Sequence, residues 1–262
     1  NLFNISGIES RVQVNISDVR DPHSLRVLVR DQDYLFNLAG QTSHLDSMIN
    51  PEIDLEINCK AQLTVLEACR HENPEIRVVF ASTRQIYGKP EYLPVDEKHP
   101  INPIDVNGIN KTAGERYHLL YSRVYGLPTT VLRLTNTYGP RMRVKDARQT
   151  FLGIWMRNII EGKPFKIFGD GMQLRDFNYV DDVVDALLVA ATDAKAVGNV
   201  FNLGGAERIS LLDVATQLTA LHPDARFELI PFPADRKAID IGDYYTDFTK
   251  ISHELGWHPS VN

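Results

Sequence analysis

The sequence predicts an α/β protein built on a parallel sheet, followed by a smaller α/β lobe. Short apolar, β-branched runs alternate with segments of helix length, which is typical of parallel strands joined by helical crossovers. Of the 262 residues, 43% are hydrophobic and 24% are charged, as in ordinary soluble globular proteins. This composition excludes collagen-like, disordered and membrane-spanning proteins.

The predicted elements of the first part of the chain follow this alternation. Helical periodicity covers 53–70 and 107–124. Compact apolar runs predict strands, of which the first shows a short polar and apolar alternation. These strands are 12–16, 33–38, 77–81 and 129–134.

From about residue 141 the pattern loosens into shorter elements. Helices are expected at 150–161 and 181–192, a short strand at 165–168, and a further helix after Ser210, which is a plausible N-cap. We therefore divide the chain into a dinucleotide-binding domain at 1–140 and a substrate lobe at 141–262. Segments around 198–222 are expected to return to the first domain.

Charge and cysteine content narrow the possible partners. The net charge of −6 removes the main electrostatic attraction for nucleic acid, so a small ligand is favoured. Cys59 and Cys69 have no zinc spacing, and no metal site is predicted. Without a secretory signal at the start of the chain, a reducing cytoplasm fits best.

Small or polar residues follow three of the predicted strands, at the sheet edge where ligands gather. A flat cofactor could approach the backbone there. Taken singly, each group is explained equally well by a turn or by a helix cap. The groups are Asp18-Val19, Asn37-Leu38-Ala39-Gly40-Gln41 and Ser82-Thr83.

Cationic side chains supply a second set of candidates. Lys111 follows Asn107 by four residues, so both side chains point to one face of a helix. Arg175 follows a glycine-rich turn and could offer its planar guanidinium to a phosphate. The alternatives are a solvated lysine and an ion pair of Arg175 with Asp176 or Asp181. Taken alone, Arg236 beside Lys237 is better explained as a solvated charge pair than as a site, and His44 is explained equally well as a surface histidine.

Taken in order, these pieces resemble the extended short-chain dehydrogenase/reductase family, the NAD-dependent epimerases and dehydratases of nucleotide sugars. The resemblance spans nearly the whole chain. Its motifs are Asn37 to Gln41, Asn58, Ser82-Thr83 with Ile86-Tyr87-Gly88, Asn136 with Tyr138-Gly139-Pro140, Arg175-Asp176-Phe177 with Val180-Asp181-Asp182, and a C-terminal block of Asp247, Lys250, Leu255-Gly256-Trp257 and Pro259.

The resemblance implies a doubly wound Rossmann-type sheet and a role for each motif residue. NAD, with NADP not distinguished, would contact Asp18, Val19, Asn37, Ala39, Gly40, Gln41, Asn58, Ser82 and Lys111. A nucleotide-diphosphate sugar would contact Ser43, Tyr87, Asn136, Arg175 and Arg236. Thr83, Asn107 and Lys111 would occupy the catalytic positions. A homodimer through a four-helix bundle of 53–70 and 107–124 is also implied.

The chain departs from the family at its hallmark Tyr-x-x-x-Lys, because Asn107 stands at the tyrosine position. A carboxamide cannot exchange a proton at neutral pH. Either another group relays the proton, or the protein binds without turnover, or the substitution was introduced. Tyr87, Tyr138 and Ser43 are candidates for another relay.

A second departure is that the family's first strand, glycine-rich turn and following helix and strand are absent. The resemblance implies about forty to fifty residues before Asn1, so we expect a longer polypeptide.

The activity within the family depends on the residues after Thr83. Arg84-Gln85 stand where dehydratases carry Asp-Glu, which disfavours a 4,6-dehydratase. A 4-epimerase or a related reductase with an altered proton relay is therefore expected. The alternative is a catalytically silent protein that binds NAD and a nucleotide sugar.

Overall fold

A computed structural model describes residues 2–145 and 150–261 and contains the predicted parallel sheet. Four strands are hydrogen-bonded in the order β1-β2-β3-β7, and every pairing is parallel. They are β1 (Tyr34–Asn37), β2 (Arg77–Thr83), β3 (Thr129–Leu134) and β7 (Val200–Asn202). The strands predicted at 33–38, 77–81 and 129–134 are confirmed.

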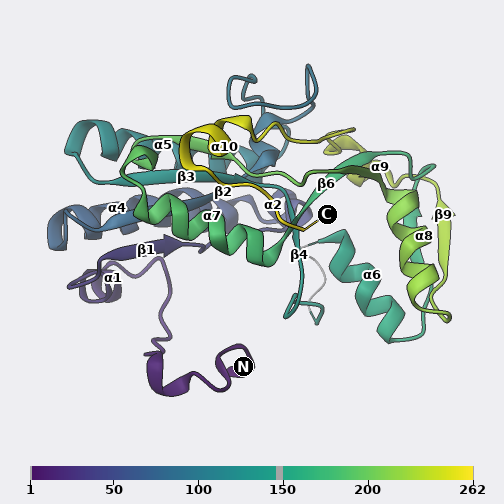
Figure 1. The fold of residues 1–262 in the computed structure, drawn as a ribbon, viewed down its shortest axis with the longest axis horizontal. Helices are drawn as coiled ribbons and strands as arrows, with labels where there is room; N and C mark the ends of the chain where they lie inside the picture. Colours follow the sequence, from purple (N-terminus) through teal and green to yellow (C-terminus); the bar gives the residue numbers. More distant parts are fainter. Residues whose placement is uncertain (1, 146–149, 262) are drawn as a thin grey trace.

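Helices cover both faces of this sheet (Figure 1), as a doubly wound fold requires. Side chains alternate along β2, so Val78 packs with helices α1 (Pro22–Leu28), α4 (Ala61–Glu72) and α5 (Val106–Tyr125). Val79 packs on the opposite face with α7 (Val180–Thr192) and α10 (Thr249–Leu255). The predicted helices at 107–124 and 181–192 correspond to α5 and α7.

The helix predicted at 53–70 is a longer run with an irregular middle. It begins as α3 (Pro51–Leu55), widens into a π-helical turn at Glu56–Lys60 and continues as α4. Such π turns are rare and often lie at functional sites. This one carries Asn58, which is fully buried.

The strand predicted at 12–16 is wrong. Residues 12–17 form no strand, and Ile16 is 97% exposed. Only the 3₁₀ turns Leu2–Ile5 and Glu9–Arg11 precede them, and in Figure 1 this segment projects away from the sheet. β1 is the edge strand among the described residues, and 12–16 does not pair with its free edge, so this segment has no strand to supply its hydrogen bonds.

The second half of the chain builds a smaller layer beside the sheet. The predicted helix 150–161 and strand 165–168 are α6 (Phe151–Ile160) and β5 (Phe165–Phe168), and β5 pairs with β9 (Phe227–Ile230). Together with α8 (Leu211–Leu221) they enclose a core around Trp155. Ser210 is the N-cap of α8, as predicted, and accepts a hydrogen bond from the Asp213 backbone amide. Of the segment around 198–222, β7 joins the main sheet, whereas α8 packs with α6.

A third sheet connects the two parts. It contains β4 (Asn136–Tyr138), β6 (Leu174–Tyr179) and β8 (Arg208–Ser210). The remaining short elements are α2 (His44–Ile49), 3₁₀ turns at Arg84–Tyr87 and Ala194–Ala196, and α9 (Ala234–Ala238). Within the described residues, every helix is too short or too polar to cross a bilayer.

Candidate functional site

The carboxyl ends of β1 and β2 meet beside α5, where the sequence places its cofactor residues. After β1 the chain is fastened to the π turn, because the Gln41 amide donates to Asn58 Oδ1 at 3.2 Å and Asn58 Nδ2 donates back to the Gln41 carbonyl at 2.9 Å. A Cβ on Gly40 would lie 2.9 Å from Lys111 Nζ and 3.0 Å from Asn58 Oδ1. A larger residue at this position would have to displace Lys111 or Asn58.

Lys111 is buried at the centre of this region. Its ammonium donates to the Ala81 carbonyl at 3.0 Å, at the end of β2. Burial lowers the pKa of Lys111 to about 8, although the charge of Asp54 acts in the opposite direction. Among the described residues no carboxylate lies at ion-pair distance from Nζ, so the ammonium keeps donor capacity for a ligand.

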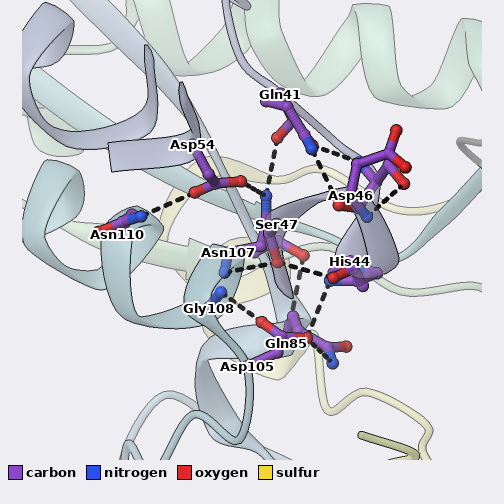
Figure 2. A network of polar contacts seen from close by, with 12 residues as sticks. Gln41, His44, Asp46, Ser47, Asp54, Gln85, Asp105, Asn107, Gly108 and Asn110 are labelled. Carbon is purple, nitrogen blue, oxygen red and sulfur yellow. Dashed lines mark hydrogen bonds and ion pairs between the residues drawn. The ribbon is translucent and has the colours of Figure 1, made fainter. Parts of the chain in front are cut away.

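Asn107 is held by protein groups on every side (Figure 2). Its Nδ2 donates to the Gln41 carbonyl at 2.8 Å and to Asp54 Oδ2 at 3.0 Å, and its backbone amide donates to Ser47 Oγ at 3.3 Å. Asn110 donates to the other oxygen of Asp54 at 2.8 Å. Because its amide hydrogens are already used, Asn107 positions the start of α5 rather than offering a donor to a substrate.

Removing the shared acceptor of this network is expected to destabilise the fold. Asp54→Ala leaves the buried amide of Asn110 without its acceptor and takes one of two acceptors from Asn107, which costs about 1–3 kcal/mol of unfolding free energy. Urea denaturation measures the loss. Glu52→Ala, at an exposed position two residues earlier, is the control and should stay within about 0.5 kcal/mol of the parent. Equal stability of the two variants would contradict a structural role for Asp54.

A histidine and a buried aspartate form a second polar group at the same edge (Figure 2). Asp105 is the N-cap of α5, and its oxygens accept from the Gly108 amide at 2.6 Å and from Gln85 Nε2 at 2.7 Å. His44 Nδ1 lies 3.0 Å from Asp105 Oδ2, although the two groups are not aligned as a hydrogen bond. Burial raises the pKa of Asp105, but the contact with His44 and these hydrogen bonds outweigh it and hold the pKa below its usual value.

The His44 side chain is 35% exposed and lines a cavity of about 220 Å³ between the main sheet and the second lobe. Because Nδ1 faces Asp105, Nε2 is the ring nitrogen that remains for a ligand. The sequence marks His44 only as a histidine near a strand end. Its pairing with Asp105 depends on tertiary structure.

Arginines line the other sides of this cavity. Arg175 donates to the carbonyls of Leu174 and Gly242, and its Nη2 lies 3.5 Å from Asp240 Oδ1. Burial lowers the pKa of Arg175 to about 10. The acid beside Arg175 is therefore Asp240, and not Asp176 or Asp181, which the sequence offered as ion-pair partners. Arg236 and Arg84 also face the cavity, and Arg236 stacks on the ring of Phe168.

Ser82 and Thr83 lie at the end of β2, next to Arg84. The Thr83 hydroxyl caps the 3₁₀ turn Arg84–Tyr87 by accepting from the Gln85 amide at 3.2 Å. The Ser82 hydroxyl donates to the buried carboxylate of Glu115 at 3.0 Å. Asn136 lies next to this end, since its Oδ1 accepts from Arg84.

Other predicted site residues lie apart from the cavity or are engaged within the protein. Asp18 pairs with Arg20 on the surface, and the hydrogen bonds from Arg20 lower its pKa to about 2. Val19 packs on the core beneath α1. Tyr87 is fully buried, its hydroxyl donates to Asn202 at 2.7 Å, and burial raises its pKa to about 12.

The remaining residues serve as local supports. Ser43 caps α2 by accepting from the Asp46 amide. Asn37 donates to Gln62 at 2.7 Å in the interior. Tyr138 lines a separate, largely apolar hollow of about 300 Å³ beside α8. Among residues 2–145 and 150–261, no group of three His, Cys, Asp or Glu side chains could hold a metal ion.

Comparison with known proteins places this arrangement in a family. Residues 4–204 match the model of the NAD dependent epimerase/dehydratase family. A UDP-glucose 4-epimerase of Mycolicibacterium smegmatis is 31% identical over 87% of this chain and 72% of its own length. A CDP-paratose 2-epimerase of Salmonella typhi is 30% identical over 94% of this chain and 79% of its own length.

Solved structures agree with these relatives. A UDP-glucuronic acid 4-epimerase of Bacillus cereus, in complex with UDP-glucuronic acid and NAD, has a TM-score of 0.87 and 27% identity, with 100% of this chain and 81% of that chain covered. Pal from Bacillus thuringiensis has a TM-score of 0.90 and 26% identity, with 99% and 82% covered. The fold, the strand-end residues and these similarities agree: the chain belongs to the NAD-dependent epimerase/dehydratase family.

Proposed function

We propose that this protein oxidises and re-reduces a nucleotide-diphosphate sugar with NAD, as a 4-epimerase or a related oxidoreductase does, through an altered proton relay. The observation that carries the proposal is the His44–Asp105 pair, with His44 in a cavity opposite arginines of the second lobe. Lys111 and Thr83 lie nearby at the end of β2, and the next residues, Arg84 and Gln85, line that cavity. A silent binding protein would need the arginines and the lysine, but it would not need a histidine oriented by a buried carboxylate.

The residues at the strand ends fit NAD. Gly40 lets the Lys111 ammonium and the Asn58 side chain approach the backbone closely, and Lys111 keeps ammonium donors suited to ribose hydroxyls. When bound, NAD supplies the acceptor and donor of the hydride. Gly40, Gln41, Asn58, Ser82 and Lys111 are the described residues that we assign to holding it.

His44 takes the proton in this proposal. Its Nε2 accepts the proton of the sugar hydroxyl as that carbon becomes a ketone, and returns it when the carbon is reduced. Asp105 stabilises the imidazolium that forms in between. Thr83 donates a hydrogen bond to the reacting oxygen. Asn107 supports this arrangement through the start of α5 and takes no part in proton transfer.

The diphosphate is assigned to the second lobe. Arg175 and Arg236 face the cavity there, and guanidinium groups bind phosphate oxygens through paired donors. The acid Asp240 already balances part of the Arg175 charge, which leaves the pair with a net positive charge toward the cavity. An anionic ligand is therefore favoured.

The test incubates the full chain with NAD and a panel of UDP-glucose, UDP-N-acetylglucosamine and UDP-glucuronic acid. Separation of sugar epimers by NMR, together with transient absorbance of reduced cofactor, supports the proposal. Tight binding of a nucleotide sugar with neither signal across the panel would support the silent binder instead. The variant Lys111→Met should remove both signals.

A homodimer through α3–α4 and α5 is also proposed. Ile53, Ile109 and Leu120 are 50%, 54% and 38% exposed on these helices, and apolar surface of this kind is typical of an interface. Ile109→Glu is expected to convert the dimer to a monomer in light scattering at micromolar concentration. The control is Leu221→Glu. Leu221 is also apolar and is 82% exposed, but it lies on α8, so this change should leave the dimer intact. A parent protein that is already monomeric would contradict the proposal.

A further inference from the structure

Arg84 occupies a position between the sheet and the second lobe that the proposed reaction does not use. It follows Thr83 directly, at the carboxyl end of β2, and opens the 3₁₀ turn Arg84–Tyr87. Its side chain lines the cavity that His44, Arg175 and Arg236 also border. The cavity therefore carries one cation from the main sheet and two from the second lobe.

The guanidinium of Arg84 is incompletely satisfied. Its Nη2 donates to Asn136 Oδ1 at 3.1 Å, and its plane lies over the ring of Tyr244, 5.3 Å from the centroid. Its Nη1 is buried without a hydrogen-bond partner. Burial lowers the pKa of Arg84, which reports the cost of holding this charge away from water.

Nearby acids do not neutralise this charge. Asp176 and Asp240 act on Arg84 only at long range, and neither forms an ion pair with it among the described contacts. One oxygen of Asp176 accepts from the Thr246 amide, and Asp240 lies against Arg175. A buried cation without a counter-ion is costly, so an anion from a ligand would stabilise it.

The position of Arg84 indicates which anionic group of a ligand it would bind. Arg175 and Arg236 stand on the second lobe, where the proposed diphosphate binds, whereas Arg84 is joined to Thr83, which is assigned to the reacting hydroxyl. Arg84 also lines the same cavity as His44, which is assigned to the proton of that hydroxyl. We propose that Arg84 binds a carboxylate carried by the sugar, so that the substrate is an acidic nucleotide sugar of the uronic acid type.

This inference rests on the proposed function and gives a preference that binding alone can measure. Titration calorimetry on the full chain compares UDP-glucuronic acid, UDP-glucose and UDP. The parent should bind UDP-glucuronic acid about 10- to 100-fold more tightly than UDP-glucose, as expected for a charged hydrogen-bonded pair. Arg84→Gln should remove this preference and leave the affinities for UDP-glucose and UDP within about threefold of the parent.

The control variant is Arg236→Gln. It should weaken all three ligands by a common factor, because the diphosphate is common to them. Arg84→Lys keeps the charge but loses the planar fork, so part of the preference should remain. If Arg84→Gln does not fold, the parent's own preference and the lysine variant decide the question.

Three results would overturn the inference. Equal affinity of the parent for UDP-glucuronic acid and UDP-glucose would overturn it and leave the proposed function intact. A common loss for all three ligands in Arg84→Gln would assign Arg84 to the diphosphate. Absence of binding by every UDP compound would refute the proposed function together with the inference.

Discussion

Replacing His44 by glutamine is expected to lower kcat by about 10²- to 10⁴-fold, while the Kd of the nucleotide sugar changes less than about threefold. Glutamine retains polarity and much of the size of the imidazole, but its amide cannot carry a proton between the two half-reactions. His44 lines the cavity and contacts a fully buried carboxylate at 3.0 Å. Steady-state epimerisation gives kcat, and calorimetry gives the Kd.

The matched variant is Asp105→Asn. Asparagine is as good an N-cap as aspartate, so α5 should keep its start, but the negative charge that stabilises a protonated His44 is lost. We expect kcat to fall about 10- to 100-fold in the single variant. In the His44→Gln background Asp105→Asn should cost almost nothing more, because the two residues act as one unit.

This non-additivity separates a relay from a structural defect. Additive losses would show that Asp105 acts on the fold independently of His44. Full activity in His44→Gln would move the proton relay elsewhere, and Ser43 and Tyr138 would be the next candidates to replace. Retained binding is the control in each case, since a collapsed cavity would lose ligand and turnover together.

Much of the fold could be predicted because each buried strand is a local apolar run. The segments 77–81 and 129–134 are compact and β-branched, and both lie in the centre of the sheet as expected. The spacing of Asn107 and Lys111 similarly fixes both residues on α5. Local patterns of this kind depend on helix and strand geometry alone.

The failure at 12–16 has a different origin. Alternation of polar and apolar residues describes a strand with one buried face, but it does not show whether a partner strand is present. Ile16, almost fully exposed, has the side chain of a core residue and none of its contacts. Sheet formation requires a second strand, and the pattern of one segment does not show whether that strand is there.

The site was predicted in part for the same reason. Motifs placed Ser82, Thr83 and Lys111 at one edge, and the structure brings them there. The proposed role of Asn107 depends on its contact with Asp54, and that of His44 on its contact with Asp105. Each partner lies more than fifty residues away along the chain. No periodicity encodes such pairings. The departure from Tyr-x-x-x-Lys indicated that something must differ, but not which side chain would compensate.

The second large effect concerns the buried ion pair behind the strand ends. Glu115 is fully buried, and its carboxylate accepts from Arg133 Nε at 3.0 Å, from Arg133 Nη2 at 2.5 Å and from the Ser82 hydroxyl at 3.0 Å. Arg133→Met removes the cation and leaves a buried carboxylate unpaired, so unfolding free energy should fall by about 3–5 kcal/mol. Urea denaturation measures the loss, and Arg123→Met on exposed α5 surface should cost less than about 0.5 kcal/mol.

The double variant distinguishes charge burial from lost packing. With Glu115→Gln added to Arg133→Met, the uncompensated charge disappears, and the double variant should be more stable than Arg133→Met alone. A double variant that is less stable than either single variant would mean that Arg133 acts through packing on Tyr87, whose ring its guanidinium covers at 4.9 Å. In the first outcome, the Ser82 hydroxyl still has an acceptor at residue 115, so cofactor affinity should recover along with stability. The Arg133–Glu115 pair would then hold Ser82 in place at the end of β2 as well as stabilise the core.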